Sequence, residues 1–317
     1  MDRLLESDKG CRLETCASEQ VRQQSLTESA EKRVLRHPNK HTKNLMKSIP
    51  LFRLLFTVFG FAIFCSTSQC RGADLAHARD GSGVYGYKDT PKLPWCQWLV
   101  HDPDRSNPKR VDAGKAGPPA AVPADATILF DGQDVSKWGP LGDWKVEDGC
   151  LISGNSHFAT KDNFGDVQLH IEWMGPANFD GPWYNRGNNG VLLMGLYEIQ
   201  IFDSFNEKIY PDGACGAIYG QTPPYVNATP PPGEWQTFDI AFTAPKFDGQ
   251  KLVSPARVTA FYNGVLILLN EEIHGTTGHR IVPEYKPQLS QGPLALGGHG
   301  CPVKFRNIWL RQLSGKG

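Results

Sequence analysis

The sequence lacks an excess of charge of either sign. Its 317 residues contain 33 Lys and Arg against 33 Asp and Glu, which gives a formal net charge of zero. A nucleic-acid-binding protein usually needs a basic stripe, and a solvating acidic tail needs a run of carboxylates. We therefore expect neither a nucleic-acid partner nor such a tail. Hydrophobic residues make up 40% and charged residues 21%, which is typical of a globular protein.

A hydrophobic run long enough to span a bilayer is also missing. The run Leu54–Cys65 has about 12 residues, whereas a spanning helix needs about 20. This length suits the core of a signal peptide. We interpret residues 46–73 as a signal peptide that begins at Met46, and residues 1–45 as a non-native or disordered preface. The sequence then predicts an exported protein, periplasmic or extracellular, with no stable membrane span after cleavage. An uncleaved membrane anchor is the alternative.

CxxC pairs are absent, and with them the usual spacing of zinc ligands. The cysteines downstream of the signal peptide are widely separated, at Cys96, Cys150, Cys215 and Cys301. In an exported protein they could form one or two disulfides, or they could remain buried free thiols. The sequence leaves both alternatives open.

No segment has the period of a long amphipathic helix. From Ala126 to Leu313 the chain instead shows short segments of alternating apolar and polar residues, such as VQLHIEW (167–173) and WQTFDIAF (235–242). Asn263-Gly264 is a two-residue hairpin turn. The pattern predicts an all-β fold over residues 126–313, an antiparallel two-sheet jelly-roll sandwich whose alternate polar residues face outward. A tail at residues 314–317 follows.

Residues 74–125 have no lasting period and are rich in Pro and Gly. They predict an irregular N-terminal extension that either lies on the sandwich or extends from it. Trp95 and Trp98 favour packing of part of the extension, since exposed tryptophans are unusual.

Several catalytic signatures are missing: the P-loop, GxGxxG, HExxH and GxSxG. The closely spaced acids of a standard glycosidase motif are missing as well. In YEIQIFD, Glu198 and Asp203 are separated by an odd offset, which places them on opposite faces of a strand unless a bulge intervenes. The sequence therefore argues against a mechanism in which two carboxylates flank one bond.

Side chains that could bind a polyol and move a proton gather in four segments, YNRGNNGV, YEIQIFD, GAIYGQTPP and GGHG. The candidate residues in them are Arg186, Asn189, Glu198, Gln200, Asp203, Tyr219, Gln221 and His299. Each also has a plainer interpretation as a turn residue, a solvated strand face, a packed aromatic or a surface histidine. Their collection in one β domain favours a site.

The order of motifs resembles a known family. LFDGQDVSKW, DWKVEDGCLI, RGNNGVLLM, YEIQIFDS, GAIYGQTPP, PPGEWQTFDI, NGVLI and HGCPVKFRNIWL follow one another over residues 126–313. The chain resembles the 3-keto-disaccharide hydrolases, also called the 3-keto-glucoside-1,2-lyase/3-keto-2-hydroxyglucal hydratase domains. Two departures stand out: many members have an arginine where this chain has Met194, and bulkier residues where it has Gly297 and Gly298.

The resemblance implies a concanavalin A-like jelly roll in an exported bacterial protein. It also implies an enzyme that cleaves 3-keto-glucosides or 3-keto-disaccharides by C2 proton abstraction, β-elimination and rehydration. A separate sugar 3-dehydrogenase would have to supply the ketone. Such chemistry does not need two flanking carboxylates, which fits the missing pair.

For this activity we expect Glu198 or His299 to be the base. Arg186, or a divalent metal ion held by Glu198 and its neighbours, would stabilise the enolate. No ligand spacing identifies such a metal. The residues expected to bind the substrate are Gln200, Asn189, Tyr219, Asp203 and Gln221. A non-catalytic, lectin-like module and an ordinary two-carboxylate glycosidase are the alternatives, because the fold alone does not fix the function.

Overall fold

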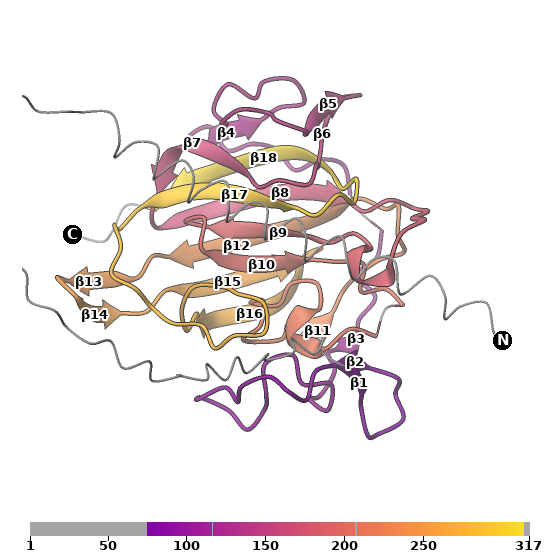
Figure 1. The fold of residues 1–317 in the computed structure, drawn as a ribbon. Coiled ribbons are helices and arrows are strands. Elements are labelled where there is room, and N and C mark those ends of the chain that lie inside the picture. The colour runs from indigo at the N-terminus through magenta and orange to yellow at the C-terminus, as the bar shows by residue number, and fades with distance from the viewer. Residues whose placement is uncertain (1–74, 116, 207, 314–317) are drawn as a thin grey trace, which may run out of the picture. The chain divides into compact units, whose positions relative to one another are not determined.

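The computed structural model describes residues 75–115, 117–206 and 208–313. The expected preface, signal peptide and C-terminal tail therefore lie outside the described residues. Within them, no helix is long and apolar enough to cross a bilayer. The helices found there are two short 3-10 helices, η1 (Trp183–Asn185) and η2 (Pro211–Gly213). All other regular structure consists of strands, which confirms the all-β fold (Figure 1).

The larger of the two main sheets has eight strands, all paired antiparallel. In order across the sheet they are β16 (Val265–Glu272), β15 (Arg257–Tyr262), β12 (Gln236–Thr243), β8 (Val167–Met174), β18 (Lys304–Gln312), β6 (Cys150–Ile152) and β5 (Lys145–Glu147), with β4 (Thr127–Phe130) also paired to β18.

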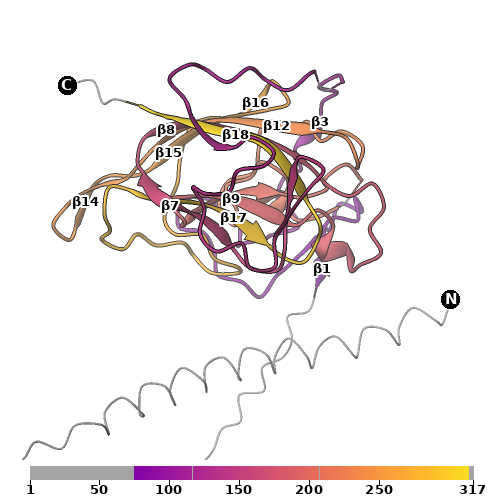
Figure 2. The same ribbon diagram turned by 90° about the horizontal axis from the view of Figure 1, so that it is seen from above.

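The smaller main sheet has four antiparallel strands. In order they are β10 (Tyr197–Ile201), β9 (Asn189–Leu193), β17 (Gly292–Gly298) and β7 (Phe158–Phe164). Figure 2 shows the two sheets as separate layers, with β9 and β17 in one and β8, β12 and β18 in the other. This is the predicted antiparallel sandwich.

Three two-stranded ribbons complete the described structure. They are β1 (Ala76–His77) with β2 (Tyr85–Gly86), β3 (Lys109–Arg110) with β11 (Val226–Asn227), and β13 (Lys246–Asp248) with β14 (Lys251–Ser254). The β3–β11 pair is parallel and joins the N-terminal extension to the body of the sandwich.

The core lies between the sheets because alternate residues of each strand point inward. Phe238, Ile240 and Phe242 of β12 are buried, as their alternation predicts. Tyr197 of β10 packs against Phe242 with ring centroids 6.0 Å apart, so the two layers are in direct contact. Asn263 has a positive φ (51°), as the predicted hairpin turn requires.

One expectation about the outer face of the large sheet is wrong. His170 and Glu172, which the alternation places outward, are each only 2% exposed. Residues of the extension cross this face, where Ala120 N–H donates to Glu172 Oε1 at 3.1 Å (Figure 2). Burial favours the neutral form of Glu172, but hydrogen bonds from Asn307, Arg306 and Ala120 outweigh it and lower its pKa.

The described part of the extension lies on the sandwich. Leu93 and Val100 are fully buried, and Trp95 stacks on His274 with ring centroids 3.7 Å apart. Cys96 in the extension and the three cysteines of the sandwich are free thiols. The described part of the sandwich therefore has no disulfide, and packing and hydrogen bonds stabilise it.

Candidate active site

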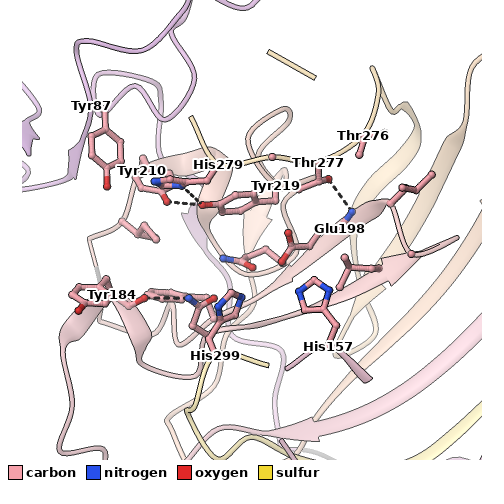
Figure 3. A pocket seen from close by; sticks show the side chains of 18 residues that line it. Tyr87, His157, Tyr184, Glu198, Tyr210, Tyr219, Thr276, Thr277, His279 and His299 are labelled. Atoms are coloured by element: carbon pink, nitrogen blue, oxygen red, sulfur yellow. Dashed lines mark hydrogen bonds between the residues drawn. The ribbon is translucent and has the colours of Figure 1, made fainter. Parts of the chain in front are cut away.

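A pocket of about 500 Å³ opens on the outer face of the four-stranded sheet. Glu198 and Gln200 of β10 point into it, because their neighbours Ile199 and Ile201 fill the core on the other face. Tyr219 and His279 lie on one side of Glu198, and His157 and His299 lie on the other (Figure 3). The segments that carry these residues are far apart in the sequence and meet through the sheet topology.

A glycine beside Glu198 makes room for its side chain. Gly190 of β9 is adjacent to β10, and a Cβ at this position would overlap Oε1 of Glu198. Gly297 of β17 is paired directly with Gly190. The strands next to Gln200 are therefore bare backbone at this level, and the Glu198 side chain lies over Gly190.

The Glu198 carboxyl lies at the bottom of the pocket, and burial raises its pKa to about 8. Its backbone N–H donates to Thr277 Oγ1 at 3.0 Å, which ties β10 to a pocket wall. With its amide nitrogen turned toward the available acceptors, Gln200 donates to the Asn189 carbonyl at 2.8 Å and to Glu198 Oε1 at 3.3 Å. Gln200 thereby orients the carboxyl.

The opposite wall carries a chain of hydroxyl and imidazole groups. Tyr219 Oη lies 3.0 Å from Tyr210 Oη and 2.9 Å from His279 Nδ1. Burial raises the pKa of both tyrosines above the ordinary value. Burial, together with His101 and Arg280, lowers the pKa of His279 to about 4. Tyr219 and His279 therefore both stay neutral at neutral pH.

His157 and His299 stand below Glu198 in Figure 3. Both rings are open to solvent at the pocket. Partial burial and the neighbouring His157 lower the pKa of His299. The backbone around His299 is fixed by Asn185, whose Nδ2 donates to the His299 carbonyl at 2.7 Å.

The described lining has one carboxyl group and no Lys or Arg side chain. Among the described residues that line the pocket, Glu198 is the one carboxyl, and no Lys or Arg is present. The described residues contain no group of three or more His, Cys, Asp or Glu side chains that could hold a metal ion together. The donor set therefore does not fit a preformed metal site. The pocket suits a neutral polyol and transfer of a proton to or from a single carboxyl.

Comparison with known proteins identifies the fold and family. The family model of the 3-keto-alpha-glucoside-1,2-lyase-like domain matches residues 125–311. The chain belongs to this family. Membership makes it a carbohydrate-active enzyme that acts on glycosides, and it confirms the resemblance seen in the motifs.

A solved structure agrees with this assignment. The chain resembles a candidate glycosyl hydrolase from Parabacteroides distasonis, with 40% identity and a TM-score of 0.58, over 60% of this chain and 84% of that one. A second candidate glycosyl hydrolase from the same organism shows 22% identity and a TM-score of 0.45, over 60% of this chain and 94% of that one. No curated protein matches the sequence.

Four of the residues expected from the sequence line the pocket of this lyase-like domain: Glu198, Gln200, Tyr219 and His299. Tyr219 and His299 reach the candidate base from two other segments, and Gln200 lies on the same strand as Glu198. The sequence could not show that these segments come together, because residues 198 and 299 are separated by most of the sandwich.

Arg186 and Asp203 are placed elsewhere. Arg186 Nε lies 2.5 Å from Asp203 Oδ2, and neither residue lines the pocket. The two chain segments are also joined by Asp203 N–H, which donates to the Arg186 carbonyl at 3.1 Å. This ion pair fixes the loop before β9 to the end of β10, so the expected enolate-stabilising role of Arg186 is not supported by its position.

Asn189 and Gln221 are buried side chains that do not line the pocket. Asn189 shares the core face of β9 with Val191, is fully buried, and does not line the pocket. Gln221 is also buried; its Oε1 accepts from His274 N–H at 2.7 Å, and its Nε2 donates to the Gly275 carbonyl at 3.1 Å. Gln221 thus supports the loop that leads to the pocket wall.

Of the positions that depart from the family pattern, Met194 and Gly298 lie outside the pocket lining. Met194 sits in the β9–β10 turn with a positive φ (53°) and is buried outside the pocket lining. A Cβ on Gly298 would come within 2.5 Å of the carbonyl oxygens of Gly154 and Ser156. This close approach, rather than contact with a ligand, requires glycine at position 298.

The sequence did not single out other lining residues for the site. Among them are Tyr87, His157, Tyr210 and His279; Tyr184 and Asn188 also line the pocket, and they lie in a segment that the sequence did mark. Tyr184 lies in η1, and the four residues that the sequence did not mark lie in loops without a periodic signal. Tyr87 lies in the extension, before the part of the chain that carries the family motifs.

Proposed function

We propose that the protein cleaves 3-keto-glucosides and 3-keto-disaccharides by elimination and rehydration, with Glu198 as the base. The observation that carries this proposal is a single carboxyl of raised pKa in a pocket whose described lining has no second carboxyl. An ordinary retaining or inverting glycosidase uses two carboxyl groups around one bond. Elimination next to a ketone needs one base.

The chemistry follows from the ketone at C3, which acidifies the hydrogen on C2. The Glu198 carboxylate takes this proton, and the C2–H electron pair forms the enolate of C2 and C3. Collapse of the enolate restores the ketone, forms a C1=C2 double bond and breaks the bond from C1 to the leaving oxygen. The leaving oxygen gains a proton, so the products are a 3-keto-2-hydroxyglucal and an alcohol. Addition of water across C1=C2 completes the net hydrolysis.

The surrounding side chains match the remaining needs of this reaction. The substrate is neutral, which fits a described lining without Lys or Arg. Tyr219 and His157, on opposite sides of Glu198, are the donors that we assign to the enolate oxygen (Figure 3). His299 is the donor that we assign to the leaving oxygen.

The proposal includes two features of the cellular setting. Oxidation at C3 has to come first, so the protein acts downstream of a separate sugar 3-dehydrogenase. Export to the periplasm or the medium is supported by the apolar run Leu54–Cys65. Sequencing the N-terminus of protein recovered outside the cytoplasm tests export, and recovery of an intact Met1 there would contradict cleavage of a signal peptide.

The activity is tested with purified full-length protein, a 3-keto-glucoside and its unoxidised parent, each with and without EDTA. We expect alcohol release from the keto sugar alone, and the EDTA arm shows whether a metal ion takes part. Release from the unoxidised parent would indicate an ordinary glycosidase. Binding without release from either compound would indicate a lectin-like module.

A further inference from the structure

The N-terminal extension contributes directly to the pocket, although it precedes the residues that match the family. Tyr87, which follows β2, lines the pocket together with residues of the sandwich. Its ring packs edge-on against His279 with centroids 5.7 Å apart. The wall of the active site therefore contains a residue from outside the family domain.

A buried pair holds this part of the extension in place. His101 and Asp212 are both fully buried; His101 N–H donates to Asp212 Oδ2 at 3.0 Å, and His101 Nδ1 lies 3.3 Å from Asp212 Oδ1. The His101 ring also packs on Tyr210 with centroids 4.1 Å apart. Tyr87 N–H donates to the His101 carbonyl at 2.9 Å, so the position of Tyr87 follows from that of His101.

The extension also holds the wall loop that carries His279. Arg280 donates through Nη2 to Asp89 at 2.8 Å and stacks over the Tyr87 ring at 4.6 Å. Thr277, at the other end of this loop, is bonded to β10 beside Glu198. Tyr87 thus contacts the same wall loop that is hydrogen-bonded to Glu198.

The end of the pocket away from Glu198 is aromatic. In Figure 3, Tyr87 and Tyr184 lie at this end, on opposite sides of the pocket. Tyr184 is 48% exposed, so its ring is accessible to a ligand. Aromatic faces carry partial negative charge, and the C–H groups on the face of a pyranose pack well against them.

We propose that Tyr87, with Tyr184 opposite it, forms a subsite for the leaving group, and that this group is a neutral second sugar ring or an aromatic aglycone. The inference rests on the proposed function, since it divides the pocket into a keto-sugar end at Glu198 and a leaving-group end at Tyr87. The extension then determines which glycosides the enzyme accepts.

The test compares kcat/KM for 3-keto-glucosides with three leaving groups: methanol, glucose and 4-nitrophenol. For Tyr87→Ala we expect a loss of about tenfold with the two ring-containing groups and less than about twofold with methanol. Tyr87→Phe should keep the wild-type preference, because it retains the ring. Tyr225→Ala is the control, since Tyr225 has the same exposed fraction as Tyr184, 48%, but does not line the pocket.

An equal loss of kcat/KM with all three substrates would overturn the proposal, because it would show that Tyr87 only stabilises the pocket wall and does not contact the leaving group. A thermal melt of each variant shows whether the fold is kept. Tyr87→Trp is a second variant for the same measurement. It should change the preference among leaving groups and leave the activity on the methyl glycoside unchanged.

A binding measurement separates this inference from the proposed function. Calorimetry with unoxidised disaccharide and methyl glucoside needs no turnover. Wild-type protein should bind the disaccharide more tightly, and Tyr87→Ala should remove most of that difference. If keto sugars are not cleaved but this difference is present, the reaction is wrong and the subsite stands. If the wild-type protein binds the disaccharide no more tightly, the subsite proposal fails.

Discussion

The carboxyl of Glu198 lies where its charged form is disfavoured, because burial in the pocket removes the water that would solvate it. An ordinary glutamate is a weak base at neutral pH. A pKa of about 8 makes Glu198 a stronger base, at the cost of having only part of the enzyme in the reactive form at neutral pH.

The reaction rate should follow the ionisation of Glu198. Because only the carboxylate accepts a proton, we expect kcat/KM to rise with pH and to level off above about pH 8. Glu198→Gln should lower kcat at least about a hundredfold throughout. Initial rates of both proteins over this range provide the measurement, and a flat wild-type profile would exclude Glu198 as the base.

The same group should make stability depend on pH. Its pKa is about 8 in the folded protein and 4.5 in the unfolded chain, so between these values the folded state holds a proton that the unfolded state has lost. Folding stability from this group is therefore lost as pH rises through the window. Glu198→Gln should gain stability relative to wild type from pH 5 to pH 8, as measured by melting temperature. A constant difference would contradict the raised pKa.

The space left by Gly190 provides a test that keeps the carboxyl. An alanine Cβ would overlap Glu198 Oε1 and turn this flexible side chain away from its position. We expect Gly190→Ala to lower kcat about tenfold or more while the melting temperature changes little. Gly139→Ala is the control, because its Cβ would be in ordinary contact with the Ala159 carbonyl at 3.4 Å. Equal activity of the two variants would show that the position of the carboxyl is unimportant.

At the scale of residues, the sequence marked four side chains that line the pocket, Glu198, Gln200, Tyr219 and His299, but it did not mark Tyr87 or His279. Glu198 and Gln200 share a strand, so alternation placed both on one face. Asn189 could not be placed in this way, because its register relative to Glu198 depends on how β9 pairs with β10. Tyr87 and His279 come from loops whose positions depend on tertiary contacts, which leave no local pattern.

At the scale of elements, the strands were predictable and the course of the extension was not. Alternation in β8 and β12 and the turn at Asn263 fixed much of the large sheet. The same alternation failed for Glu172 on β8, because the extension covers that face. A Pro- and Gly-rich segment carries no period that could show which surface it crosses.

The attachment of the extension depends on the buried pair of His101 and Asp212. Burial favours the neutral form of Asp212, but His101 and Arg105 outweigh it and lower its pKa. Asp212→Ala would leave His101 buried without this partner, at an expected cost of about 3–5 kcal/mol in the free energy of unfolding. Asp212→Asn, which keeps an acceptor for His101 N–H, should cost less. Urea denaturation measures both, and equal values would contradict the role of the pair.

At the scale of the molecule, the part of the chain that packs as one unit is longer than the part that matches the family model. Leu93 and Val100 lie before residue 125 and are fully buried against the sandwich. A shortened protein that begins at residue 125 should melt on the order of 10 °C below one that begins at residue 75, since it loses the His101 pair and this packing. Equal melting temperatures would show that the extension contributes no stability.

The location of Tyr87 has a consequence for the evolution of this enzyme. The candidate base, Glu198, is encoded after residue 125 and part of the pocket wall before it. A recombination event at this boundary would keep the reaction and replace the wall, so relatives with identical sheets could differ in the glycosides they degrade. In such a lineage the range of substrates would be inherited with the N-terminal extension rather than with the sandwich domain.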